Sequence, residues 1–185
     1  MKQRIVLIGA GAVVVVLALI LVLQQKPPQK IFKNNVEQVL TTAFTLPLAG
    51  VEDYPGGDVY NPPVKQWLRE RLLDRFKGEG ALDAFYSRMV ITNKAWPVLL
   101  ELSEQGPITV SDVVLEPTVQ NSAKFRMTVR YQLDGVPGEG VLAGRAQHDG
   151  TGALIFMEMD AYSADDLIAG LGEEFAVYRS ALRPR

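Results

Sequence analysis

The sequence predicts an α+β domain that follows an N-terminal transmembrane helix. Three observations predict it. Residues 5–23 contain no charged side chain, apolar residues recur at helical spacing between residues 34 and 102, and they alternate with polar residues from residue 108 onward. We therefore expect helices packed on a curved antiparallel sheet of about four strands, followed by a C-terminal helix. The expected division is a short head with a transmembrane signal anchor (1–23), a Pro-containing tether (24–33) and an extracytoplasmic α+β domain (34–185).

The apolar run from Ile5 to Leu23 has the length of a membrane span. As a helix its nineteen residues would cover about 28 Å, close to the hydrocarbon thickness of a bilayer. Gly9-Ala10-Gly11 imitates the start of a dinucleotide-binding turn, but Val14 holds the position of the third glycine. The residues that follow have no polar face. We expect residues 5–23 to lie in the lipid bilayer.

A cleaved signal peptide is the alternative reading of this segment. Lys2 and Arg4 would supply its charged start. The apolar core, however, exceeds the usual ~7–15 residues, and no small-x-small cleavage site follows it. Basic residues lie on both sides of the run, so charge alone does not orient it. A four-residue head leaves no room for a cytoplasmic function, so we expect a single-pass protein of a bacterial cell membrane with its C-terminal domain outside the cytoplasm.

The composition of the domain excludes several classes of function. Residues 34–185 carry 14 Lys and Arg against 21 Asp and Glu, a net charge of −7. Such a surface repels nucleic acid, so no nucleic-acid partner is expected. The chain has no cysteine, which excludes disulfides and thiolate metal sites. No cofactor and no metal are expected.

Three predicted helices, one long loop and one undecided segment precede the sheet. A first helix, capped by Asn34 or Asn35, should end at Pro47, and a loop from Leu46 to Asn61 follows. A second helix should begin at Pro62 with Asn61 as its cap and stop at Gly78. A third spans about Ala81 to Val90, whereas Ala95–Leu102 is undecided because Pro97 interrupts it. Their buried stripes are Val36, Val39, Leu40, Ala43 and Phe44, then Val64, Trp67, Leu68, Leu72 and Phe76, then Leu82, Phe85, Tyr86 and Met89.

Alternation with period two predicts the strands. They cover Ile108–Val119, with a bulge at Asp112 and an edge or end at Pro117, then Ala123–Leu133, Glu139–Gln147 and Gly152–Ala161. We place the two turns at Val136-Pro137 and at Asp149-Gly150. This register gives one wholly uncharged face, formed by Met127, Val129, Tyr131 and Leu133, by Gly140, Leu142, Gly144 and Ala146, and by Ala153, Ile155, Met157 and Met159.

The tail has its own apolar stripe, preceded by a capping-box-like pair at Ser163 and Asp166. The stripe comprises Leu167, Leu171, Phe175, Tyr178 and Leu182. The outer sheet face carries Val141, Leu154 and Phe156 in the predicted register. We expect the tail to fold over that face. The alternative is that the tail binds a protein partner through Leu171, Phe175 and Tyr178.

Helices followed by a long antiparallel sheet of about four strands resemble the NTF2-like fold over Asn35–Ala161, by element order rather than by a motif. A cystatin-like layout is the nearest alternative. Membrane-anchored NTF2-like domains occur in bacterial conjugation and secretion assemblies. The resemblance therefore implies an interaction or scaffolding module of an envelope assembly, bound to a protein partner.

An enzyme or small-ligand carrier is the competing hypothesis. It would use an apolar pocket around Phe125, Tyr131, Leu142 and Met157. No hydrolase, zinc-protease or phosphate-loop motif occurs, and the only histidine, His148, falls in a predicted turn where we expect it to be exposed. We interpret Glu158 as a partner in cross-strand ion pairs with the neighbouring arginines. No catalytic residue is assigned.

Overall fold

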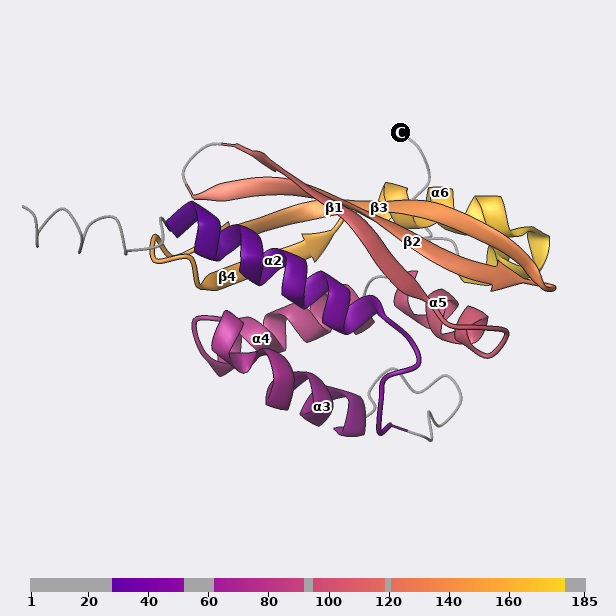
Figure 1. Cartoon of the computed structure of the whole chain (residues 1–185), viewed down its shortest axis with the longest axis horizontal. Helices are drawn as coiled ribbons and strands as arrows, with labels where there is room; N and C mark the ends of the chain where they lie inside the picture. Colours follow the sequence, from indigo (N-terminus) through magenta and orange to yellow (C-terminus); the bar gives the residue numbers. More distant parts are fainter. Residues whose placement is uncertain (1–27, 52–61, 92–94, 119–120, 179–185) are drawn as a thin grey trace, which may run out of the picture.

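The structure is a computed structural model that describes residues 28–51, 62–91, 95–118 and 121–178 (Figure 1). The apolar run at residues 5–23 lies outside these ranges, and within them no helix combines the length and apolar character that a bilayer span requires. The described chain is an α+β fold with five α-helices and a four-stranded antiparallel sheet of order β1-β2-β3-β4. The expected α+β class is confirmed.

The elements follow one another as the periodicity predicts. The α-helices are α2 (Pro28–Phe44), α3 (Pro62–Leu72), α4 (Glu79–Phe85), α5 (Ala95–Ser103) and α6 (Ala161–Leu171). Short 3-10 or π helices are η1 (Leu73–Arg75), η2 (Tyr86–Ile91) and η3 (Glu173–Tyr178). The strands are β1 (Thr109–Pro117), β2 (Ser122–Leu133), β3 (Val136–His148) and β4 (Leu154–Met159).

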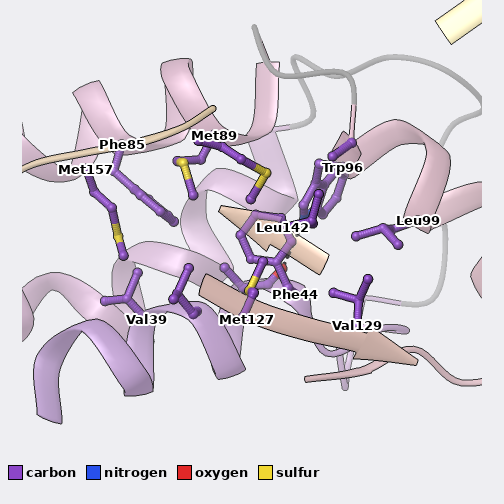
Figure 2. Packing of buried hydrophobic residues seen from close by; sticks show 14 of the residues in the cluster. Val39, Phe44, Phe85, Met89, Trp96, Leu99, Met127, Val129, Leu142 and Met157 are labelled. Carbon is purple, nitrogen blue, oxygen red and sulfur yellow. Dashed lines mark hydrogen bonds between the residues drawn. The ribbon is translucent and has the colours of Figure 1, made fainter. Parts of the chain in front are cut away.

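One hydrophobic core lies between the helices and one face of the sheet, which we call the inner face. Figure 1 shows α2, α3 and α4 stacked on one side of the strands. In Figure 2, Val39 and Phe44 of α2, Phe85 of α4 and Met89 of η2 point toward Met127 and Leu142 of the sheet. All six side chains are buried. The expected stripes of the first three helices form this layer, with Trp67 only partly buried.

Helix α2 begins earlier than the sequence suggested. It starts at Pro28, so the expected cap at Asn34 or Asn35 is wrong, and part of the expected tether is helical. The buried Phe32 extends the apolar stripe of the helix by one turn. Asn35 is itself buried and donates from Nδ2 to the carbonyl of Gly152 at 2.9 Å. Tertiary contacts with the β3–β4 turn therefore hold the first two turns of this helix in place.

The other helices differ from expectation mainly at their ends. Helix α3 ends at Leu72 and continues as η1, and Gly78, with φ of 102°, precedes α4 instead of ending α3. The third predicted helix is α4 continued by the π-helix η2. The undecided segment forms α5, where Pro97 lies in the first turn and no intrahelical N–H is required.

The first strand behaves as its sequence indicates. The register of β1 against β2 shifts between Ser111 and Val114, and Asp112 has a φ of 52°, so the expected bulge is confirmed. β1 is an edge strand and ends at Pro117. A bulge and a proline both discourage pairing of another strand along this edge.

The predicted turn between β2 and β3 is wrong by two residues. The turn residues are Asp134 and Gly135, both with positive φ, as a type I′ turn requires. Tyr131 consequently pairs with Gly138 instead of Leu142. The shift changes each partner by an even number of residues, so every side chain of β2 and β3 keeps its predicted face.

The last hairpin also departs from the predicted register. Met157 pairs with Ala146 and Met159 with Gly144, and a bulge follows Gln147. The bulge reverses the alternation, so Leu154 is buried and Ile155 is exposed, opposite to expectation. The loop between the strands is longer than the two-residue turn assumed at Asp149-Gly150.

The tail does not cover the outer sheet face. Asp160, not Ser163, caps α6 by accepting a bond from the N–H of Tyr162 at 3.0 Å. Leu167 fills the space beside Gly140, which shares the inner face with Leu142, and α6 also contacts α5. β4 pairs only with residues 144–148 of β3, so α6 instead covers the part of β3 that β4 leaves open. The expectation that the tail folds over the outer face is wrong.

Candidate functional site

Three of the four residues expected to line an apolar pocket lie in the packed core. Phe125, Leu142 and Met157 are 1%, 0% and 1% exposed. Figure 2 shows Leu142 and Met157 among side chains from several helices, including Phe85 and Trp96. Their apolar surface is therefore occupied by the protein's own residues. Neither Leu142 nor Met157 lines any of three surface hollows in the described structure, whereas Phe125 is among the residues that line one of them.

Tyr131 lies at the margin of the inner face and is half-buried. Its ring covers Gly138 on the neighbouring strand, where an added Cβ would lie 2.5 Å from the ring Cε2. Burial raises the pKa of its hydroxyl above the ordinary value. The contact with glycine explains why Gly138 carries no side chain, and it gives Tyr131 a packing role in this sheet.

The residues proposed for partner binding on the tail lie in α6 and η3. Leu171 and Phe175 are both buried within the domain. Tyr178 is the last residue of η3. The burial of Leu171 and Phe175 favours the reading in which the tail stabilises the fold.

The helices leave the outer face of the sheet uncovered. Val114 and Val141 point outward on β1 and β3 and are 48% and 54% exposed, and Ile155 on β4 is 36% exposed. Phe156 of β4 is half-buried. Apolar side chains exposed on one continuous sheet face are typical of an interaction surface. We call Val114, Val141, Ile155, Phe156 and the charged residues around them the outer-face patch.

A hollow of about 520 Å³ lies within this patch. Its outward-pointing alanine, Ala143, is short, and Arg126 opposes it on β2. Because long charged side chains surround a small one, the centre of the patch is recessed. The charged residues that line the hollow are Glu116, Lys124, Arg126, Arg145, Glu158 and Asp160. Three of these are basic and three acidic, so the rim carries both signs of charge.

Ion pairs organise that rim. Arg126 lies 2.6 Å from Glu116 on β1, and Arg145 lies 2.5 Å from Glu158 on β4. The expected cross-strand role of Glu158 is confirmed. All four side chains are partly exposed, so each pair contributes little to stability. Paired charges in fixed positions instead provide a pattern that a partner can recognise.

A residue from the helical layer extends this cluster. Arg88 of η2 reaches Glu158 at 3.2 Å, and its guanidinium lies 4.7 Å from the ring centroid of Phe156. Arg145 lies 5.5 Å from the same ring. Two arginines thus share one carboxylate and one aromatic ring. Strand alternation predicted that Arg145 and Glu158 share the outer face of the sheet. No local pattern in the sequence predicted that Arg88 lies beside them.

Sequence reasoning also missed a polar contact at the β3–β4 turn. His148 is buried, not exposed, and its ring centroid lies 4.6 Å from that of Phe32. Its Nδ1 accepts a bond from the N–H of Gly150 at 3.1 Å. Asp149 accepts from the hydroxyl of Thr151, and this bond is the main reason that the pKa of Asp149 lies below its ordinary value. The residues hold the turn against α2.

Within the described ranges, no three His, Asp or Glu side chains are grouped in a way that could hold a metal ion. The outer-face patch also has no buried general base, because its carboxylates are exposed, paired or used in capping. Comparison of the chain with models of protein families, with curated proteins and with solved structures found no match in any of the three.

Proposed function

We propose that this protein is a membrane-tethered extracytoplasmic interaction module that scaffolds an assembly of a bacterial envelope. The apolar run at residues 5–23 is the proposed single-pass anchor. The outer-face patch is the proposed partner-binding surface. The observation that carries the proposal is the contrast between a filled inner face and an outer face with exposed Val114 and Val141.

The patch has the composition of a protein interface. It combines aliphatic residues with Phe156, which two arginines approach, and arginines and aromatic residues are enriched at interface centres. Charges of both signs border it. A partner with matching pairs of opposite charge would be recognised, whereas a polymer of one charge would not.

The fold is consistent with a relationship to NTF2-like domains, and we propose that relationship as the origin of the architecture. Helices α2 to α5 precede four antiparallel strands, as in that fold. Helix α6 and the segment between α2 and α3 are additions to the pattern. The cystatin-like layout is the alternative, and a single helix wrapped by a sheet fits less well because several helices cover the inner face.

The ligand-carrier hypothesis needs an open interior. Phe125, Leu142 and Met157 are instead packed against helical side chains. A small apolar ligand would therefore have to displace core side chains, at a cost in packing. The interaction module needs no such rearrangement, and we prefer it for this reason.

A charge-insertion experiment tests the proposal. Val141→Asp in the full chain should leave the thermal melt unchanged while it removes partner proteins that co-purify from detergent-solubilised membranes. Val177→Asp is the matched control, because Val177 is also exposed but lies on η3, which contacts α5 and α6. The proposal would be wrong if the two variants recovered the same partners as the parent chain.

A further inference from the structure

The two ends of the sheet are connected differently to the rest of the chain. We call the first residues of α2 (28–32), together with the β3–β4 turn (148–152), the proximal end. We call the β2–β3 turn at Asp134 and Gly135 the distal end. Strands β2 and β3 run between these ends (Figure 1). We infer that the proximal end rests on the lipid headgroups, so that the sheet stands upright on the membrane.

Helix α2 is fixed to the β3–β4 turn. Asn35 donates to the carbonyl of Gly152, and the ring of Phe32 contacts that of His148. Gly152 has a φ of 105°, and an added Cβ there would lie 2.7 Å from Cβ of Ile31. The close approach therefore requires glycine. The start of α2 moves with the sheet as one body.

Only a short segment separates the proposed anchor from the start of α2. The apolar run ends at Leu23 and α2 begins at Pro28, so four residues separate them. Four residues span at most about 14 Å. The headgroup layer on each side of a bilayer is roughly 5–8 Å thick. The start of α2 and the turn bound to it must therefore lie at or just above the headgroups, an inference that rests on the proposed anchor.

The proximal end carries basic side chains. Lys30 and Lys77 are exposed there, and Lys26 lies in the four-residue spacing. Asp149 lies 3.8 Å from Nζ of Lys77, so these two charges partly neutralise each other, and the excess of positive charge comes from Lys26 and Lys30. This balance is basic, although residues 34–185 as a whole carry a net charge of −7. Anionic headgroups attract such a basic end and repel the remaining acidic surface.

The upright position has a consequence for the outer-face patch. Thirteen residues of β3 extend for about 40 Å at the rise of a strand. The patch then faces sideways, within about 40 Å of the lipid surface. Its partner would be another protein held close to the same membrane.

Depth-dependent quenching tests this inference on the full chain. The chain has no cysteine, so Thr151→Cys at the proximal end and Val136→Cys at the distal end each accept a single fluorophore. The variants are reconstituted in vesicles of phosphatidylcholine and phosphatidylglycerol that contain a headgroup nitroxide. We expect quenching at residue 151 to exceed that at residue 136 by about twofold or more, because only the first label is near the headgroups. Equal quenching would overturn the inference.

Two controls separate the possible failures. Insertion of a flexible Gly-Ser segment of about ten residues between Lys26 and Pro27 should make the two values converge, because the segment releases the domain from the surface. Unchanged values in the insertion variant would refute the argument from spacing. Carbonate extraction is performed on each preparation. Release of the chain would refute the proposed anchor and this inference together, whereas an inserted chain with equal quenching refutes the inference alone.

Discussion

The two faces of the sheet are built from the same strands but meet different surroundings. On the inner face, Phe125, Met127 and Leu142 are buried beneath the helices. On the outer face, Val114 and Val141 are exposed among ion-paired residues. The fold needs the first face for its stability, since the buried apolar residues of the strands lie there. Among the described residues, the outer face contributes none to the core beneath the helices. The comparison of the two faces therefore directs the search for a binding function to the outer face.

The comparison is tested most sharply by adjacent residues of β3 that point to opposite faces. Leu142 is 0% exposed and Val141 is 54% exposed. Leu142→Asp places an unpaired carboxylate in the core and should cost more than about 4 kcal/mol, enough to unfold the domain. Val141→Asp should change the free energy of unfolding by less than about 0.5 kcal/mol. Urea titrations of the two variants, followed by circular dichroism, measure both values. Similar midpoints would show that the faces are wrongly assigned.

The tail provides a second test of the inner face. Phe175 is buried beside α5 and α6, so Phe175→Ala should lower the free energy of unfolding by about 3 kcal/mol. Val177→Ala, at an exposed position on the same short helix, should have almost no effect. Thermal melts of the two variants give the comparison. If Phe175→Ala left the melt unchanged and abolished partner recovery instead, the tail would be an interaction helix.

Truncation at the start of α2 tests where the layer of helices on the inner face begins. A chain that starts at residue 28 retains Phe32 and its contact with His148, whereas a chain that starts at residue 34 loses both. We expect the shorter chain to be less stable by about 2 kcal/mol, the value of burying one large apolar side chain. Denaturant midpoints of the two truncated chains measure the difference. Equal midpoints would mean that residues 28–33 are a tether after all.

Strand alternation predicted the faces of β2 and β3 but not their register. Any shift by an even number of residues leaves each side chain on its face, so hydrophobic pattern alone does not choose between pairing Tyr131 with Leu142 and pairing it with Gly138. The residues of the turn do distinguish between these two registers. Asp134-Gly135 is the stronger turn signal because both residues accept positive φ, and local sequence contained that information.

Other features depend on contacts between distant segments. His148 is buried because α2 extends back to place Phe32 against it, and Arg88 reaches Glu158 from a helix that is 70 residues away in sequence. The sequence predicts the tail on the outer face because its apolar stripe would cover Val141, Leu154 and Phe156, the apolar residues that the predicted register places there. The early end of β4 instead leaves part of β3 for α6 to cover. The candidate site was thus partly predictable on the strands and not predictable where helices reach it.

The central claim is that the outer face, and not another exposed part of the domain, meets the partner. A photo-crosslinking amino acid at position 141 in the full chain tests it directly in intact membranes, with position 177 as the comparison. We expect irradiation to give a discrete crosslinked species from position 141 that is absent from position 177 and is lost when Arg145→Glu reverses one charge of the rim. The same species from both positions, or none from positions 114, 141 and 156, would contradict the account.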